Sequence, residues 1–364
     1  MATTPRAEST TPAPITSAER GGSRRPRPFR NGRDSNWRRA TRWLLIAGAA
    51  VAAAIAPSQL NSYQLFIATL IGVYAISALG FSLLVNWTGQ LGVAHAAFMG
   101  LGAYGSAIMV DRGLPFVLAL VLAIVGTAIA GSLLAFPAVR LRGFFLAVAT
   151  LAIGDLIVRS FSQFDGLTGG GAGMAVPLIR IGGWGQSESV YAMTMCSLFV
   201  IYALSARMLR GRFGEILLTV RHLGPTADTL GISTLRYQML AFGWSAAIGA
   251  LAGVLFAQLQ TYLTPSAFGF GFLVLLLVMM IIGGASIVGS LIGAAFVVIL
   301  LEWLQALALY QRFAYATTLI VVIVVLPGGL ASLPTQLKRL RLDRLIHPLT
   351  MWRQLTISGD DDVD

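Results

Sequence analysis

Besides Trp87, five residues with hydrogen-bonding side chains lie in a stretch of chain that is otherwise apolar or small. They are Asn86, Thr88, Gln90, His95 and Tyr104, in the sequence NWTGQLGVAHAAFMGLGAY, which follows the apolar run LIGVYAISALGFSLLV. In a lipid bilayer, polar groups are tolerated only where they face protein or a water-filled path. We therefore predict that these five residues either bond to neighbouring helices or face a water-filled path through the membrane. For His95 both roles stay open.

The residues that would mark an enzyme are missing from the sequence. A phosphate-binding P-loop needs a lysine after its glycines, and the single lysine, Lys338, follows LPTQL instead. The histidines His95, His222 and His347 lie far apart, and Cys196 is the only cysteine. We therefore expect no metal site and no intramolecular disulfide. We predict that the chain is not an enzyme and holds no cofactor.

Ionisable residues inside apolar runs can couple transport to protons or ions. The candidates are few: Asp155 with Arg159 four residues later, Glu302, and His95. We interpret Asp155 and Arg159 as a pair that neutralises itself near a helix end, in preference to a proton relay. We interpret Glu302 as a residue that reaches the membrane interface. The energy for transport would then come from another source.

The elements that position these residues are predicted to be membrane-spanning helices. Hydrophobic residues make up 56% of the chain, charged residues make up 11%, and the mean hydropathy is +0.76. A globular domain carries about 25% charged residues. Apolar windows of about 20 residues, the length that crosses a bilayer, recur along the chain. We predict an all-α polytopic membrane protein with about ten transmembrane helices. The predicted spans are 43–60, 64–85, 91–110, 115–137, 143–160, 190–208, 237–261, 269–286, 288–306 and 313–333.

The basic residues assign the sides of the membrane. An even number of spans puts both termini on one side, and 22 of the 26 Lys and Arg residues fall in the tails and connections of that side. The positive-inside rule makes this side cytoplasmic. Residues 1–42 are predicted to be a disordered basic cytoplasmic tail that contacts anionic lipid and not nucleic acid. We predict that residues 43–334 form the membrane domain and residues 335–364 a second cytoplasmic tail.

Two connections are longer than the others. Residues 161–189 are Gly-rich and predicted to be external, and residues 209–236 are predicted to be cytoplasmic and helical. Within the second, GPTADTLGI predicts a short helix, because Gly224 and Pro225 suit a helix start and Gly231 suits a helix end. Such a helix could dock onto a partner that supplies energy, or it could simply connect two spans.

A faint internal repeat is also visible. TGQLGVAHAAFMGLGAY (88–104) resembles GGASIVGSLIGAAFVVI (283–299), with small residues ahead of an apolar span. Transporters are often built from such repeats, although small residues also serve close helix packing in lipid. Both interpretations stay open.

Several motifs together carry a resemblance to a known family. The motifs are NWTGQLGVAHAAFMGLGAYGSA, VRLRGFFLAVATLAIGDLIVR, LTGGGAGM, GRFGEILLTVRHLGPTADTLGISTLRYQMLAFGWSAAIGALAGVLFA, GGASIVGSLIGAAF and VLPGGLASL. From about residue 60 to residue 334, the chain resembles the membrane permease subunit of bacterial ABC importers for branched-chain amino acids. The resemblance implies a multi-pass protein of the bacterial cytoplasmic (inner) membrane.

The resemblance also implies partners and site residues. The partners are a second permease subunit, cytoplasmic ATP-binding subunits that hydrolyse ATP, and an extracytoplasmic solute-binding protein. Residues 215–231 correspond to the family's ATPase-docking region, which places Arg221, Asp228 and Gly231 at that contact. Where the family commonly has an Arg-Glu-Asn run, this chain has Arg221-His222-Leu223, so the docking role carries over without individual charge contacts. Two alternatives stay open: the same importer class for urea, short amides or another small polar solute, and an autonomous secondary carrier.

Overall fold

The apolar windows form long helices in the computed structural model, which describes residues 57, 59–90, 92–138, 144–179, 185–284 and 286–305. Most of the described helical residues belong to nine helices. These are α2 (Ser62–Leu83), α3 (His95–Asp111), α4 (Phe116–Ala138), α5 (Phe144–Gln163), α7 (Gln186–Arg210), α8 (Arg212–Leu223), α9 (Thr234–Gln260), α10 (Phe270–Gly283) and α11 (Ile287–Gln305). The shorter elements are η1 (Leu84–Thr88), α6 (Asp165–Thr168), β1 (Met174–Ala175), η2 (Gly224–Leu230), β2 (Tyr262–Leu263) and η3 (Pro265–Phe268).

Seven helices in the described part of the chain are long and apolar enough to cross a membrane, which confirms the helical membrane class. The span predicted at 91–110 is shorter than expected. Its helix, α3, begins only at His95 and has 17 residues, or about 26 Å at 1.5 Å per residue. The span predicted at 313–333 and nearly all of 43–60 lie outside the described residues, so ten spans stay a prediction.

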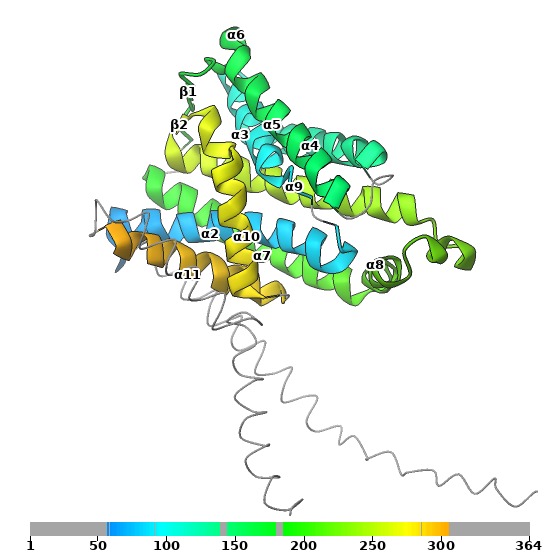
Figure 1. Cartoon of the computed structure of the whole chain (residues 1–364). Helices are drawn as coiled ribbons and strands as arrows, with labels where there is room; N and C mark the ends of the chain where they lie inside the picture. Colours follow the sequence, from blue (N-terminus) through cyan, green and yellow to red (C-terminus); the bar gives the residue numbers. More distant parts are fainter. Residues whose placement is uncertain are drawn as a thin grey trace, which may run out of the picture. The chain divides into compact units, whose positions relative to one another are not determined.

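Helices α2 and α9 form the centre of the described bundle. In their most apolar windows 72% and 78% of the residues are buried, against 22% in α4 and in α5. Figure 1 shows α2, α7, α9 and α11 running across the view, while α10 crosses α2 and α11. The apolar side chains left exposed on α4 therefore face lipid or other subunits.

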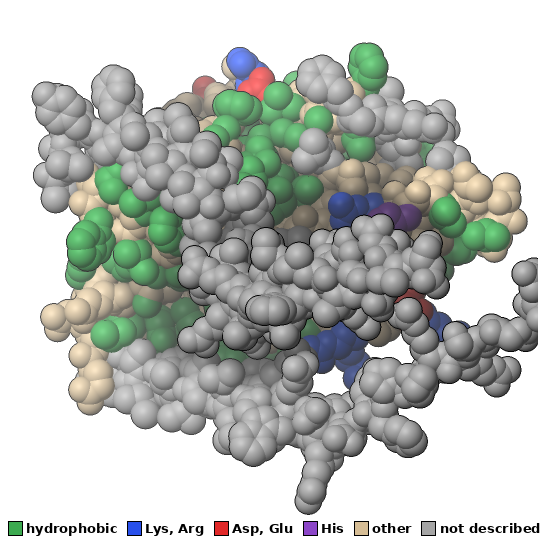
Figure 2. Space-filling view, turned by 60° about the horizontal axis from the view of Figure 1, so that its bottom comes forward, with side chains coloured by type: hydrophobic (Ala, Val, Ile, Leu, Met, Phe, Trp, Pro, Cys, Tyr) green, Lys and Arg blue, Asp and Glu red, His purple; other side chains and the backbone are tan. Residues whose placement is uncertain are grey.

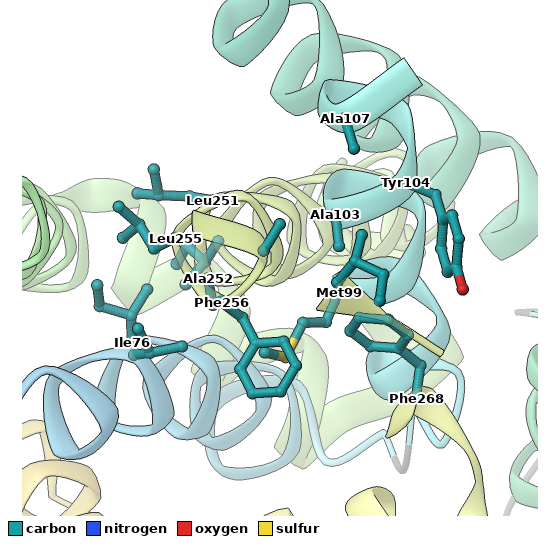
Figure 3. Close-up of a cluster of buried hydrophobic side chains, with 14 of the residues drawn as sticks. Ile76, Met99, Ala103, Tyr104, Ala107, Leu251, Ala252, Leu255, Phe256 and Phe268 are labelled. Atoms are coloured by element: carbon teal, nitrogen blue, oxygen red, sulfur yellow. The ribbon is translucent and has the colours of Figure 1, made fainter. Parts of the chain in front are cut away.

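Glycines set how closely α3 and α9 approach each other. A Cβ added at Gly102 would collide with the backbone of Ala250, and one added at Gly253 would collide with the carbonyl of Met99. Figure 3 shows the buried cluster beside this contact, which includes Met99 and Ala103 of α3 and Phe256 of α9. Small residues let helices pack at van der Waals distance in lipid, where no hydrophobic effect drives association.

Helices α10 and α11 make a similar close contact. A Cβ at Gly283 would collide with the backbone of Gly289, and the reverse also holds. The two segments of the faint repeat, 88–104 and 283–299, therefore both contain glycines at a close contact between helices. Glycines at close contacts are expected both from an internal repeat and from helix packing alone, so the repeat stays a prediction.

The two long connections lie at opposite ends of α7 and α9. The 209–236 connection contains α8 and η2, which come directly after α7 and directly before α9. At the other end, β1 pairs antiparallel with β2, with Met174 opposite Leu263 and Ala175 opposite Tyr262. The all-α prediction is wrong in this detail, because the 161–189 connection forms a short ladder with the residues that follow α9.

Candidate functional site

The first candidate region is the junction between α8 and η1. Arg221, near the end of α8, donates a hydrogen bond from Nη1 to the backbone carbonyl of Asn86. The same side chain covers Gly89, where an added Cβ would lie 3.2 Å from Arg221 Cγ. Gly89 has a φ of 72°, in the left-handed region that glycine adopts most easily. The 209–236 connection is therefore attached to the polar stretch that begins at Asn86.

Local side-chain bonds support the π-helix η1 and the turn that follows it. Asn86 Nδ2 donates to Ser82 Oγ at 2.9 Å, and the Thr88 hydroxyl donates to the carbonyl of Leu84. The Gln90 backbone N–H in turn donates to Thr88 Oγ1 at 3.3 Å. These residues end α2 and turn the chain toward α3. Asn86 and Thr88 therefore shape the backbone of this turn.

The predicted short helix is confirmed as the 3-10 helix η2, and Gly231 ends it with a φ of 78°. Asp228 accepts a hydrogen bond from the backbone N–H of Thr234, at the start of α9, at 2.9 Å. The backbone N–H of Ile232 donates to the carbonyl of Ala227 at 3.2 Å. Asp228 and Gly231 thus fix η2 to the first turn of α9.

The outer side of α8 and η2 presents a mixed apolar and basic surface, which we call the α8–η2 surface. Its exposed residues are Arg221, His222, Leu223, Thr226, Asp228, Thr229 and Leu230. The other side of α8 is anchored, because Leu217 packs in one cluster with Leu84 and Phe242. Figure 2 shows arginine and histidine side chains gathered on the right of the view, the side on which α8 lies in Figure 1.

His95 is fully buried where α2, α3 and α9 meet. Its Nδ1 lies 3.0 Å from Ser245 Oγ of α9, and the Ser245 hydroxyl donates to the carbonyl of Gly80 in α2 at 2.9 Å. The ring also lies against glycines, since a Cβ at Gly80 or at Gly249 would come within 2.9 or 3.2 Å of His95 Cε1. This placement favours the helix-packing role for His95.

Gln90 and Tyr104 are buried at different places. Gln90 is 7% exposed, and its Oε1 has no hydrogen-bond partner among the described residues. The ring of Tyr104 stacks on Phe161 at 4.7 Å between centroids and lies 6.0 Å from Phe268. In Figure 3 the Tyr104 hydroxyl points away from α9.

The second candidate region is a cleft of about 390 Å³ between α3, α5 and the start of α10. Its walls are apolar or small apart from one acidic residue, Asp155. The lining residues are Val93, Ala96, Ala97, Val148, Leu151, Ala152, Gly154, Asp155, Val158, Phe268, Gly269, Phe270 and Leu273. The polar stretch contributes only its small and apolar members, so none of the five predicted path residues lines this cleft.

Sequence reasoning missed two features of these regions. Ser245, which joins α9 to His95, is one small residue in an apolar helix and gives no signal of its own. The sequence predicts Asp155 near a helix end, but α5 continues to Gln163, so Asp155 lies well inside the helix. The cleft beside it is formed by segments far apart in the sequence.

The fold and these regions define a multi-span helical membrane protein with an exposed amphipathic connection at one end. Residues 63–326 match the family described as the permease component of branched-chain amino acid transport systems. The chain belongs to this family. It is a permease of the cytoplasmic membrane, as the sequence predicted, and a permease component is not itself a catalytic subunit.

Two curated relatives come from Escherichia coli. The high-affinity branched-chain amino acid transport system permease protein LivM is 29% identical over 331 residues, covering 82% of this chain and 76% of the relative. The corresponding permease protein LivH is 28% identical over 295 residues, covering 73% of this chain and 93% of the relative. Among solved structures, PsaBC from Streptococcus pneumoniae in complex with Fab aligns with a TM-score of 0.41 at 15% identity, covering 79% of this chain and 99% of that one.

Proposed function

We propose that this chain is one of two permease subunits of an ATP-driven importer for branched-chain amino acids. The observation that carries the proposal, beyond family membership, is the α8–η2 surface. It combines the exposed apolar residues Leu223 and Leu230, 43% and 65% exposed, with basic side chains. A surface of this kind on a firmly anchored helix suits docking into a groove of a partner protein.

In the proposed machine, separate cytoplasmic subunits bind and hydrolyse ATP. Their movement would reach the membrane helices through α8, since Arg221 bonds to Asn86 and Asp228 bonds to the start of α9. The path from the docking surface to α2 and α9 is therefore short. A solute-binding protein would deliver the amino acid to the opposite end of the bundle, where β1 and β2 pair.

The proposed orientation places α8 and η2 in the cytoplasm. Arginines gather at this end: Arg207, Arg210, Arg212, Arg221 and Arg236 all lie in or beside the 209–236 connection. This agrees with the positive-inside rule. We further propose that the spans predicted at 43–60 and 313–333 complete a bundle of ten, with both termini in the cytoplasm.

The second permease subunit of the importer is either a second copy of this chain or a different, homologous chain. Because LivM and LivH of Escherichia coli both resemble this chain, we propose that its partner permease is a second, homologous subunit and not a second copy. Purification of the assembled complex followed by mass measurement tests this, since a homodimer of this chain would be seen directly.

The proposed cargo is tested by uptake of labelled leucine into cells lacking this chain and into the same cells with the chain restored. We expect restored uptake that excess isoleucine and valine suppress, and that survives an uncoupler while ATP is held constant. Restored uptake of labelled urea instead would support the same class of importer with a different solute. Uptake that collapses with the proton gradient would contradict ATP-driven transport and favour a secondary carrier.

A further inference from the structure

Asp155 and Arg159 form an exposed charged pair on the apolar helix α5. Arg159 Nε donates to Asp155 Oδ2 at 2.5 Å, and the two side chains are 74% and 56% exposed in the isolated chain. Their helix α5 begins at Phe144, so at 1.5 Å per residue Asp155 lies about 16 Å along it. A helix that crosses a ~30 Å hydrocarbon core from its first residue would place Asp155 near the middle of that core.

The cost of exposing this pair to lipid differs between its members. A long arginine side chain can reach toward a membrane surface, but an aspartate side chain is too short to do so. Charged residues at such depth almost always face the interior of a bundle or a water-filled cavity. The exposed side of α5 that carries Asp155 and Arg159 must therefore face an aqueous path or another subunit.

The pair continues a stripe of α5 that forms one wall of the cleft. Val148, Leu151, Ala152 and Asp155 follow one another at helical spacing and all line it. Arg159 comes one turn after Asp155 on the same face. The opposite wall is small and apolar, with Ala96 and Ala97 of α3 among its residues. The recess formed by the cleft and this pair has the Asp155 carboxylate in its wall, and the Arg159 guanidinium is bonded to that carboxylate.

We propose that this recess is a binding site for the zwitterion of an aliphatic α-amino acid on the translocation path. The Asp155 carboxylate would accept hydrogen bonds from the α-ammonium group, and the Arg159 guanidinium would donate to the α-carboxylate. The branched side chain would occupy the apolar hollow. The proposal rests on the proposed function and adds to it the residues that contact the solute.

The chemistry of the recess matches this solute in charge, polarity and size. Without solute the two charges neutralise each other, and a zwitterion converts one ion pair into two without adding net charge. Charge-assisted hydrogen bonds of this kind are about twice as strong as neutral ones. A volume of about 390 Å³ lies within the range of small-molecule pockets, which are mostly apolar with a few placed polar groups. Urea carries no charges for the pair to bind and no aliphatic group for the hollow.

The test uses the assembled importer, with its partner subunits and binding protein, reconstituted in liposomes with ATP. Asp155→Asn and Arg159→Gln should each lower leucine uptake at least about tenfold, the effect of losing one charge-assisted bond. The matched controls are Asp111→Asn and Arg112→Gln, because these two charged residues are exposed at the end of α3. The controls should stay within about twofold of the unmodified importer. Assembly and ATP hydrolysis are measured for every variant.

The exchanged variant D155R/R159D separates solute binding from simple neutralisation. It keeps an ion pair in the helix but reverses the charges relative to the apolar hollow, so uptake should remain lost while the complex still assembles. If the exchange restores uptake, or if Asp155→Asn transports leucine normally, the pair only neutralises itself and the site is refuted while the proposed function stands. An unmodified importer that moves no branched-chain amino acid would refute both.

A second measurement detects binding without transport. In a Cys196→Ser background, which removes the exposed native thiol, Ala152→Cys places a thiol in the cleft wall. Leucine should slow its reaction with a methanethiosulfonate reagent. Isoamylamine and 4-methylpentanoate, which each lack one charged group, should slow it less. Equal rates with and without leucine, in a complex that still imports leucine, would contradict the site.

Discussion

Arg221 in α8 donates a hydrogen bond to the backbone carbonyl of Asn86, 135 residues earlier in the chain. The bond joins the two regions that the sequence singled out separately: the polar stretch after the first described span and the connection predicted to dock onto a partner. It reaches the five-residue π-helix η1, which directly follows α2, so a movement of α8 acts on the turn between α2 and α3.

This contact gives the first prediction. Arg221→Ala should uncouple the importer, because α8 loses its bond to η1 and the side chain that covers Gly89. We expect leucine uptake to fall about tenfold, while the ATP-binding subunits still co-purify and hydrolyse ATP. Arg210→Ala, which removes a charge at the end of α7, serves as the control. Normal uptake by Arg221→Ala would show that the bond does not transmit movement.

The left-handed backbone at Gly231 gives the second prediction. Proline cannot adopt a φ of 78°, so Gly231→Pro should disrupt η2 and abolish uptake while membrane insertion remains. Gly231→Asn is the matched control, since asparagine enters the left-handed region more readily than other non-glycine residues. Uptake and membrane content are measured in parallel. Full uptake by Gly231→Pro would show that this loop only connects α8 to α9 and has no docking role.

The bonds among His95, Ser245 and Gly80 give the third prediction. Ser245→Ala leaves a buried histidine and a buried carbonyl without this partner, which costs about 1–3 kcal/mol. We expect a lower thermal unfolding temperature in detergent. In a double-mutant cycle, Ser245→Ala combined with His95→Phe should cost less than the sum of the two single changes. Strict additivity would mean that the bond contributes nothing to stability.

The close approach of α3 and α9 gives the fourth prediction. Gly102→Ala puts a methyl group into the backbone of Ala250, and overpacking of this kind costs about 1–3 kcal/mol. Gly126→Ala on α4 is the matched control, because an added Cβ there meets nothing within 4 Å. Folded yield and thermal stability should drop for the first variant only. Equal stability of both would show that the two helices separate easily.

The sequence predicted the helices better than their junctions. Eight of the ten predicted spans fall on described helices, because uninterrupted apolar windows leave the backbone no alternative to helix in lipid. The sequence also predicted the short helix that ends at Gly231. A glycine can end a helix by adopting a left-handed φ, and this depends on that one residue and not on a distant partner. The prediction started α3 too early, because Gly89 and the turn before His95 keep residues 92–94 out of the helix.

For the candidate site, the sequence predicted which residues are polar but not which residues they contact. Asn86, Thr88, Gln90, His95 and Tyr104 were singled out as one group because they are polar in an apolar stretch. The structure separates them: Asn86 contacts α8, His95 joins three helices, and Tyr104 packs among aromatic rings. A residue's type states that it needs a partner, but the partner comes from another part of the chain.

By itself, the sequence determined that this chain is a helical membrane protein, because apolar length and charge distribution act locally and add up along the chain, and its motifs carried the resemblance to permeases. Only the tertiary structure decided which polar residues meet. The carbonyl of Asn86 accepts a hydrogen bond from Arg221, and His95 Nδ1 lies within hydrogen-bond distance of Ser245 Oγ. Asp155 lines a cleft formed by three helical segments. These contacts depend on how closely helices approach, and that distance is set by glycines whose effect appears only when two helices face each other.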